Sequence, residues 1–522
     1  MQFTPLSWFQ KCLGFFHGWP PKELDGSRET AWLDGVRGLA AFLVVMNHYD
    51  LEWLSIFAYA PFGARVLADK NVDGVWYYKE GDRLWEPYRL PFFRIIAASG
   101  SAEVAIFFVL SGFVLSWSPL GTIRANNQEK LFGSLSSSLI RRWFRLYLPC
   151  FIVGVFYLIN EIYVSWHGVI GMFEEIWTFI EESRRWSNPL QGTPATSLFT
   201  VNTYNYVMWT IPFEFSGSIF VFTLLLAIGR TQAFHRRMVC VILTTMYAGW
   251  QTYWGLWLFG MGLALADYVR WRGGFNKLSQ QTGPIARCAW ILVFVLSLLL
   301  MGYVDESDEF TRPGYAWLSY IPIPPGYRGM VGEGRVWFAI AGFLFVASSC
   351  HLTFVRRFHE TKLIQHLGRI SFMLYLIHIL INTRVSLPLR GALYDALCEN
   401  RSQDGFDHVF ISGPFTNVFI WLVVWLISVP IAMSCAHFLE IFVDKPCNEF
   451  GKWLDDKFVN GSGRVKLQSG QEEAGLLSQI PLDQLQPGEA SEVAEPLLSP
   501  KFSLESASTS SIDHGTEVPG KG

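Results

Sequence analysis

Long apolar stretches alternate with shorter polar ones from residue 33 to residue 440. A membrane-spanning helix needs about 20 mostly apolar residues to cross a hydrocarbon core about 30 Å thick. The stretches that meet or approach this length are 33–53, 94–118, 146–165, 206–229, 237–250, 251–269, 286–303, 336–353, 363–386 and 415–440. The fifth and sixth can also be interpreted as one long, bent segment. The pattern predicts an all-α polytopic membrane protein, a bundle of about ten transmembrane helices.

The ends of the chain and its long connections differ from this pattern. Residues 1–31 have apolar side chains on one helical face, which predicts a cytosolic segment with a short helix on the membrane surface. The connections 51–93 and 166–205 are rich in Trp, Tyr and Pro and are predicted to be outer loops that fold over one face of the bundle. After residue 450, Ser, Gly, Pro and Glu predict a disordered cytosolic tail over 451–522. The transmembrane domain is therefore expected to occupy 32–450.

The distribution of lysine and arginine predicts the orientation of the bundle. Short loops on the cytosolic side of a membrane are enriched in these two residues. They are densest in the connections 119–145, 230–237, 270–287 and 354–369, all on the side of the N-terminus. Both termini are therefore predicted to be cytosolic, in a multi-pass protein of an endomembrane or the plasma membrane.

The composition narrows the classes of partner. Half of the residues (51%) are hydrophobic, with 22 Trp and 43 Phe, as expected for a protein surrounded by membrane lipids. The net charge of -3 argues against a nucleic-acid partner. The eight cysteines form no CxxC pair, so neither a metal site nor a disulfide framework is predicted.

Three titratable side chains lie inside predicted spans, where ionisable groups are costly and often mark functional sites. At a rise of about 1.5 Å per residue, His48 and His378 lie about 22 Å from the cytosolic edge and Glu214 about 18 Å. A neutral histidine in a dry pocket is a suitable general base for a hydroxyl, and Glu214 is predicted to orient or stabilise such an imidazole. The alternative is that these residues serve helix packing. Glu103 is a further candidate, or a partner of Arg94 or another cation.

A group of arginines is predicted at the cytosolic edge. It comprises Arg37 in the first span, Arg141, Arg142 and Arg145 in RRWFRLYLP, and Arg369 near the start of the ninth span. Arginine is suited to bidentate phosphate contacts, so the group is a candidate anion clamp for a phosphate-bearing donor. Positive-inside topology with anionic lipid headgroups is an equally weighted explanation.

Small residues within the spans are predicted to serve packing. Ser111-Gly112, in IFFVLSGFVLSW, does not form the nucleophile motif GxSxG. Gly260 and Gly262, in FGMGLALAD, lack the spacing of a dinucleotide-binding fingerprint. Close helix approach through small residues is the favoured interpretation of both segments.

Six segments resemble, in chain order, motifs of the membrane-bound acyltransferase 3 family. LDGVRGLAAFLVVMNHY is similar to the first-helix motif, with Arg37 and His48 at the spacing Arg-x10-His. The other similar segments are IFFVLSGFVL, RRWFRLYLP, WTIPFEF, LGRISFMLYLIHI and FVDKP. WTIPFEF carries Glu214 and LGRISFMLYLIHI carries His378, whereas FVDKP has Asp444 where the family has Glu.

The resemblance implies a ten-helix bundle that transfers an acyl group from acyl-CoA, most simply acetyl-CoA, to a hydroxyl of an acceptor. It implies that His48 is the catalytic base and that Arg37 binds or positions the donor. The predicted catalytic residues are thus His48, Glu214 and His378, and the predicted donor-binding residues are Arg37, Arg142, Arg145 and Arg369.

Two other functions are compatible with the sequence. A proton-coupled carrier would use His48, Glu214 and His378 as a proton relay. The halves of the chain show no internal symmetry of the kind many carriers have, which counts against this hypothesis. A lipid-binding scaffold without chemistry ranks last, because it requires the buried ionisable residues to be incidental.

Overall fold

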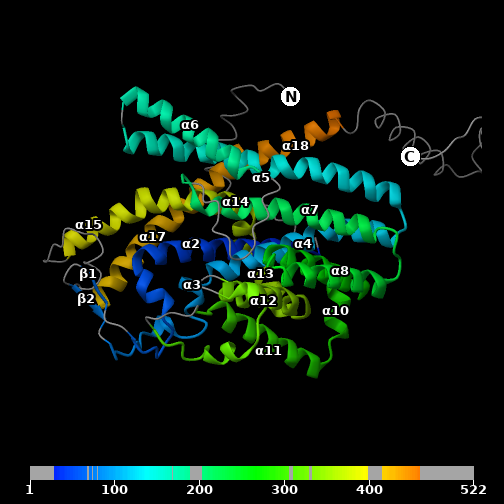
Figure 1. Cartoon of the computed structure of the whole chain (residues 1–522), viewed down its shortest axis with the longest axis horizontal. Helices are drawn as coiled ribbons and strands as arrows, with labels where there is room; N and C mark the ends of the chain where they lie inside the picture. Colours follow the sequence, from blue (N-terminus) through cyan, green and yellow to red (C-terminus); the bar gives the residue numbers. More distant parts are fainter. Residues whose placement is uncertain are drawn as a thin grey trace, which may run out of the picture. The chain divides into compact units, whose positions relative to one another are not determined.

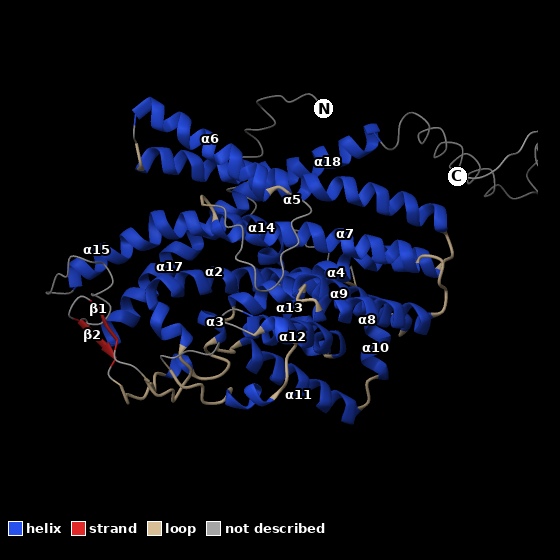
Figure 2. Ribbon diagram, viewed as in Figure 1, coloured by secondary structure: helices blue, strands red, loops and turns tan. Residues whose placement is uncertain are grey.

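The computed structural model describes residues 29–67, 70–72, 75–78, 80–166, 168–188, 203–304, 310–328, 332–397 and 414–458. The chain divides into two units after Asp455, and the first is a bundle of helices (Figures 1 and 2). The longer helices are α2 (Ala31–Tyr59), α4 (Gly100–Arg124), α5 (Gln128–Val164), α6 (Gly168–Trp186), α7 (Thr210–Ile228), α8 (Phe234–Trp250), α9 (Trp254–Trp271), α11 (Pro284–Met301), α12 (Gly332–His351), α14 (Lys362–Ile381) and α17 (Pro414–Leu439).

Short elements connect and extend these helices. The short α-helices are α3 (Ile95–Ala98), α10 (Phe275–Gln281), α13 (Thr353–His359), α15 (Leu387–Leu397) and α18 (Lys445–Phe458). The 3₁₀ helices are η1 (Pro87–Arg89), η2 (Tyr206–Trp209), η3 (Ala316–Tyr320) and η4 (Pro325–Tyr327). Two π-helical segments, η5 (Asn382–Ser386) and η6 (Glu440–Asp444), continue α14 into α15 and α17 into α18. One antiparallel pair of strands is described, β1 (Lys70–Val72) and β2 (Val75–Tyr78), drawn in red in Figure 2.

Seven helical stretches in the described residues are long and apolar enough to cross a membrane. They are Gly100–Arg124, Gln128–Val164, Tyr206–Ile228, Pro284–Met301, Gly332–His351, Lys362–Leu397 and Val418–Lys457. The chain is therefore a polytopic all-α membrane protein, as predicted. The other three predicted spans are helical as α2, α8 and α9, but α8 has only 17 residues and α2 carries Asp34, Arg37 and Asp50. The predicted count of ten spans is not confirmed.

The spans predicted at 237–250 and 251–269 are two helices and not one bent segment. α8 ends at Trp250 and α9 begins at Trp254. Between them Thr252 has a φ of 68°, a conformation that interrupts a right-handed helix.

Several segments predicted as loops contain helices. Most of 119–145 is helical, because α4 and α5 are joined by a short turn in which Asn127 accepts a hydrogen bond from the Lys130 amide and caps α5. The segment 166–205 contains α6, whose buried Phe179 and Trp186 lie two turns apart on one face. The polar residues on the other faces of α6 conceal it in a hydropathy scan.

The structure also changes the predictions for the first outer loop and for the two terminal segments. α2 extends nine residues into the predicted outer loop 51–93, which also contains the two strands. α18 extends to Phe458, so the first residues of the predicted disordered tail are helical. The rest of that tail and nearly all of the predicted surface segment 1–31 lie outside the described residues.

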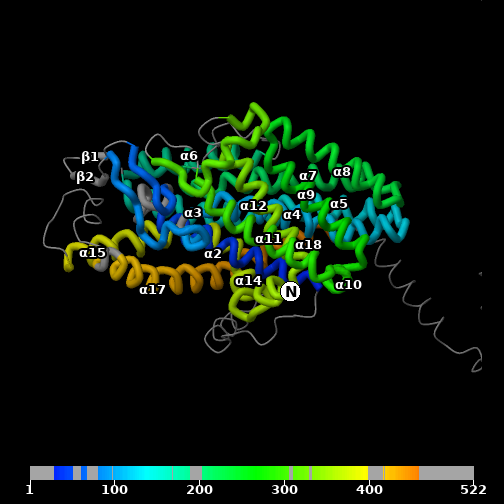
Figure 3. Tube along the Cα trace, turned by 90° about the horizontal axis from the view of Figure 1, so that it is seen from below, coloured from blue at the N-terminus to red at the C-terminus, as the bar shows by residue number. Residues whose placement is uncertain are grey.

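The helices pack in pairs that bring distant parts of the chain together. α14 packs against both α2 and α17, and α4 packs against α9 and α7 (Figure 1). Figure 3 shows α15 and α17 lying side by side. In the contact between α4 and α9, a Cβ on Gly112 would lie 2.0 Å from the Phe259 carbonyl oxygen and one on Gly262 2.2 Å from that of Val109. The prediction that these glycines serve packing is confirmed.

Two glycines set the separation of α2 and α14. A Cβ on Gly38 would lie 2.1 Å from the backbone nitrogen of Gly368, and a Cβ on Gly368 would lie 2.3 Å from the carbonyl oxygen of Asp34. The obstructing atoms are backbone atoms, which no rotamer change can move. The two backbones are therefore in direct contact at the end of the bundle where both helices begin.

We expect Gly38→Ala to destabilise the protein by about 1–3 kcal/mol, because overpacking forces backbone shifts. The matched control is Gly391→Ala in α15, where an added Cβ meets nothing within 4 Å. Melting of the two purified variants in detergent checks the prediction. Equal melting temperatures for the two would contradict it.

Candidate active site

A cavity of about 220 Å³ lies among α2, α4, α5, α7 and α14, the helices that carry the predicted site residues. Its charged lining residues are Asp34, Arg37, Arg142, Arg145, Glu214, Arg369 and Asp444. Its apolar lining includes Val104, Phe107, Leu110, Leu146, Ile211 and Phe372. The structure thus brings all four predicted donor-binding arginines together with Glu214 around one cavity.

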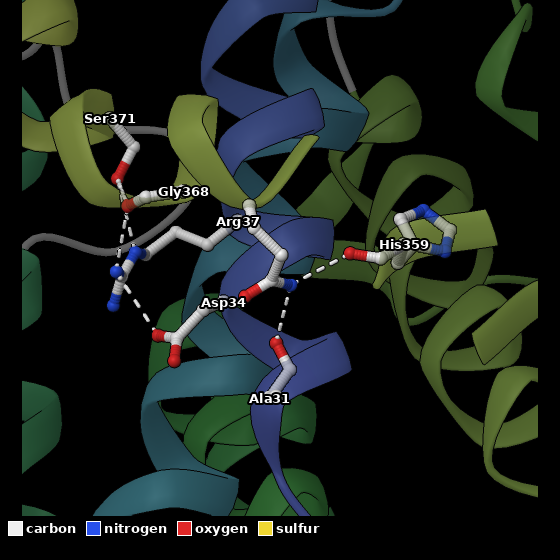
Figure 4. A network of polar contacts seen from close by, with 7 residues as sticks. Ala31, Asp34, Arg37, His359, Gly368 and Ser371 are labelled. Atoms are coloured by element: carbon white, nitrogen blue, oxygen red, sulfur yellow. Dashed lines mark hydrogen bonds and ion pairs between the residues drawn. The ribbon is translucent and has the colours of Figure 1, made fainter. Parts of the chain in front are cut away.

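Arg37 joins α2 to the beginning of α14 at the wall of this cavity (Figure 4). Its Nε donates to Ser371 Oγ at 3.1 Å, and its Nη2 donates to the Gly368 carbonyl oxygen at 2.9 Å. Nη2 also lies 3.1 Å from Asp34 Oδ1. These contacts fix the plane of the guanidinium, and the close approach at Gly368 allows them to form.

Arg142 and Glu214 form an ion pair between α5 and α7. Arg142 Nη2 lies 2.7 Å from Glu214 Oε2, and Arg142 Nε donates to Ser218 Oγ at 2.9 Å. Ser111 Oγ donates to Glu214 Oε1 at 2.9 Å. The sequence predicted that Glu214 would orient an imidazole. Its carboxylate is instead held by Arg142 and Ser111, so that contact is not formed.

The other two arginines of the cavity differ in their partners. Arg369 Nη2 donates to His437 Nδ1 at 3.0 Å, and its Nε lies 3.8 Å from Glu440 Oε2. Arg145 is exposed and, among the charged residues that line the cavity, it alone makes no hydrogen bond or ion pair with the described residues. Arg37, Arg142 and Arg369 each have a carboxylate partner, in Asp34, Glu214 and Glu440, whereas Arg145 has none among the described residues.

His48 and His378 form a hydrogen-bonded pair between α2 and α14. His48 Nδ1 lies 3.0 Å from His378 Nε2. His378 Nδ1 lies 2.8 Å and 3.2 Å from the carbonyl oxygens of Tyr375 and Leu374, which only accept, so this nitrogen carries the proton. In the neutral ring His378 Nε2 is then an acceptor, and His48 donates to it from Nδ1. Nε2 of His48 is left as the basic nitrogen of the pair.

Neither histidine lines the cavity, but a tyrosine next to His378 does. Tyr375 lines the cavity, and its ring centroid lies 6.0 Å from that of His378. Its hydroxyl donates to the Val207 carbonyl oxygen at 2.5 Å and lies 2.9 Å from Thr210 Oγ1. The ring of Phe107 meets that of Tyr375 at an angle of 66°. These hydrogen bonds hold the Tyr375 ring in place.

The remaining predicted contacts are not formed. Glu103 is 1% exposed and accepts a hydrogen bond from Ser99 Oγ at 3.0 Å, without the ion pair to Arg94 that was one expectation. Because Glu214 contacts Arg142 and Ser111 and neither histidine, the three residues predicted for a carrier's proton relay do not form one hydrogen-bonded chain. In the described part of the chain, no group of three or more His, Cys, Asp or Glu residues is arranged to hold a metal ion.

Comparison with protein families identifies the family of this chain. The profile of an acyltransferase domain matches residues 30–437, which include the histidine pair and all the residues that line the cavity except Asp444. The chain belongs to the acyltransferase 3 family. It is therefore a membrane-bound acyltransferase, which transfers groups other than aminoacyl groups.

Three curated relatives are similar to this acyltransferase along much of its length. The O-acetyltransferase PaAT-1 of Phomopsis amygdali is 26% identical over 509 residues, which cover 90% of this chain and 93% of that protein. The acyltransferase clz18 of Cochliobolus lunatus is 23% identical and the acyltransferase R4 of a Phoma species 22%, each over 67% of this chain and 82% of the relative. No solved structure matches the chain.

Sequence reasoning missed several residues of this acyltransferase site. Asp34 contacts Arg37 and was not predicted as a site residue; Ser111 contacts Glu214, whereas the favoured interpretation of its segment was helix packing. The spacing of Ser111 indicates its place. Val104, Phe107 and Ser111 are three and four residues apart, so they lie on one face of α4, and all three line the cavity. For His437 and Glu440, which hold Arg369, the sequence contains no motif that indicates this contact.

Proposed function

We propose that this acyltransferase moves an acyl group, most simply acetyl, from acyl-CoA to a hydroxyl of an acceptor, with His48 as the general base. The observation that carries the proposal is the set of hydrogen-bond partners of the histidine pair. With these partners, His48 donates from Nδ1 to His378, and its Nε2 is the basic nitrogen. The acetyl group is supported by the full-length similarity to a protein named as an O-acetyltransferase.

The arginine-lined cavity is the proposed donor site. Coenzyme A carries phosphate groups, which match arginine in charge and in hydrogen-bond geometry. Arg37, Arg142 and Arg369 already have partners within the protein, which fix their side chains, whereas Arg145 has all its donors available for a phosphate. The apolar part of the cavity, including Phe107 and Ile211, is the proposed place for the acyl end.

The proposed reaction is a direct transfer. His48 Nε2 takes the proton of the acceptor hydroxyl as its oxygen attacks the thioester carbonyl. A C–O bond forms, the C–S bond breaks, and the departing sulfur receives the proton from His48. During this step His48 continues to donate from Nδ1 to His378, which holds the ring in one orientation. In this proposal the acyl group passes Tyr375 and Phe107, which line the cavity beside His378, to reach the pair.

The predicted topology completes the proposal. Both termini would be cytosolic, and the donor would enter from the cytosol. The acceptor would approach from the side of His48, with the protein surrounded by membrane lipids. The four arginines lie near the beginnings of α2 and α14 or around the same cavity, which agrees with a cytosolic donor.

The direct test is transfer of labelled acetyl from acetyl-CoA into a product, using membranes that contain the protein and control membranes that lack it. Label in a new product only with the protein supports the proposal and provides the product for identification. The carrier hypothesis predicts solute uptake by proteoliposomes without any acyl donor. Uptake of that kind, with no transfer of label, would overturn the proposal.

We expect Arg145→Gln to raise the KM for acetyl-CoA about 10- to 100-fold, the value of one or two charge-assisted hydrogen bonds, while kcat changes less. Steady-state kinetics over a range of acetyl-CoA concentrations check this. The matched control is Arg236→Gln, because Arg236 is exposed on α8 and does not line the cavity. An unchanged KM for Arg145→Gln would remove this residue from the donor site.

A further inference from the structure

The side chain of Tyr157, in α5, forms hydrogen bonds with two backbone groups of one turn of α14. Tyr157 Oη donates to the Leu376 carbonyl oxygen at 2.9 Å and accepts from the Leu380 amide at 3.1 Å. In a regular α-helix these two backbone groups, four residues apart, are each other's partners. Side chains that bond to this ladder are a known cause of local change in helix geometry.

A second buried donor reaches the same carbonyl from a different segment. Asn205 is 0% exposed, and its Nδ2 donates to the Leu376 carbonyl oxygen at 3.0 Å. The next residue, Tyr206, packs its ring against His48, with 5.5 Å between ring centroids. Asn205 and Tyr206 thus connect the α14 turn to the ring of His48.

The turn held in this way contains His378. This residue lies midway between Leu376 and Leu380, and its Nδ1 donates to carbonyl oxygens of the preceding turn. The π-helical segment η5 begins at Asn382, one turn further along. Helical irregularities of this type are frequent at functional sites. Neither Tyr157 nor Asn205 lines the donor cavity, and the turn that both contact is the one that carries His378.

We propose that Tyr157 and Asn205 are positioning residues for the acyl transfer, which fix the Leu376–Leu380 turn so that His378 Nε2 meets His48 Nδ1. This inference rests on the proposed function of the pair. Three hydrogen bonds from two separate elements define the turn, and the turn defines the direction of the His378 ring. The hydroxyl of Tyr157 matters in this role, while its ring fills space in the bundle.

The test compares Tyr157→Phe and Asn205→Ala with wild type in acetyl transfer from labelled acetyl-CoA, with the full chain in membranes. Misplacing a reacting group by about 1 Å costs up to about 100-fold in rate, so we expect kcat to fall about 10- to 100-fold. The KM for acetyl-CoA should stay within about twofold of wild type, since both residues lie outside the donor cavity. The matched control is Tyr163→Phe, because Tyr163 is 83% exposed on the same helix.

A double-mutant cycle separates positioning from a purely structural role. In a His378→Ala background, measured over long incubations, Tyr157→Phe should cause no further loss of transfer. Equal losses with and without His378, or a wild-type kcat for Tyr157→Phe, would overturn the inference. If wild-type protein transfers no acetyl, the proposed function itself fails, and this inference fails with it. An active wild type with an unaffected Tyr157→Phe variant rejects the positioning role alone.

Discussion

Replacing His48 by alanine should lower the rate of acetyl transfer by about 10²- to 10⁴-fold, the range that a positioned general base contributes. The residue supplies the Nε2 nitrogen proposed to accept the proton of the acceptor hydroxyl. Binding of acetyl-CoA should persist, because His48 does not line the donor cavity. The measurement is labelled acetyl transfer together with thermal protection of the purified variant by acetyl-CoA.

Two further variants make this expectation specific. His378→Ala should cause a smaller loss than His48→Ala, because it removes the acceptor that orients the base and leaves the base itself in place. His235→Ala should retain wild-type transfer, since His235 is exposed on α8, away from the pair. A folded His48→Ala variant with full activity would exclude His48 as the base. Another group would then have to accept the proton of the hydroxyl.

The spacing of motif residues explains why part of the site is predictable from the sequence. Arg37 and His48 are eleven residues apart, close to three helical turns, so both lie on nearly the same face of α2. Ser371 and His378 are seven residues apart, close to two turns, and lie on one face of α14. Two such faces in contact pair Arg37 with Ser371 and His48 with His378. The 3.0 Å between their ring nitrogens agrees with the similar depths predicted for the two histidines.

The partner of Glu214 was not predictable in the same way. The position of Glu214 along its span predicts only its depth in the bundle. At that depth its carboxylate could contact either a histidine imidazole or an arginine guanidinium. The packing of α5 against α7 decides between them, because it brings Arg142 within 2.7 Å. Such lateral packing leaves no periodic signal in a sequence. Tyr157 illustrates the same limit, since nothing in its surrounding apolar run marks the hydroxyl that reaches α14.

Hydropathy likewise located most helices but not all of their boundaries. It detects apolar length, so it found the seven helical stretches that could cross a membrane. It missed α6, in which only one face is apolar, and it ended the first span at residue 53, although α2 continues to Tyr59. The residues that lower the hydropathy of α2 include Arg37 and His48, the same residues that the proposed chemistry requires.

Breaking the ion pair between Arg142 and Glu214 should have the second large effect, on stability as well as on transfer. The side chains are only 13% and 14% exposed, and removing one partner of a buried pair leaves an uncompensated charge that costs about 3–5 kcal/mol. Arg142→Met and Glu214→Met should therefore each lower the melting temperature in detergent. The double variant should regain most of the lost stability, because an apolar pair of similar volume replaces a buried ion pair at little cost.

The activity of that double variant decides what the pair does. If Arg142 and Glu214 shape the donor cavity, as proposed, the stable double variant should still have a raised KM for acetyl-CoA and reduced transfer. The matched control is the same exchange at Arg237 and Asp267, an ion pair at 2.8 Å between α8 and α9 that is more deeply buried and lies outside the cavity. That double variant should retain both stability and transfer. Wild-type kinetics in the Arg142/Glu214 double variant would show that this pair serves the fold alone, and would leave Arg145 and Arg37 to bind the donor.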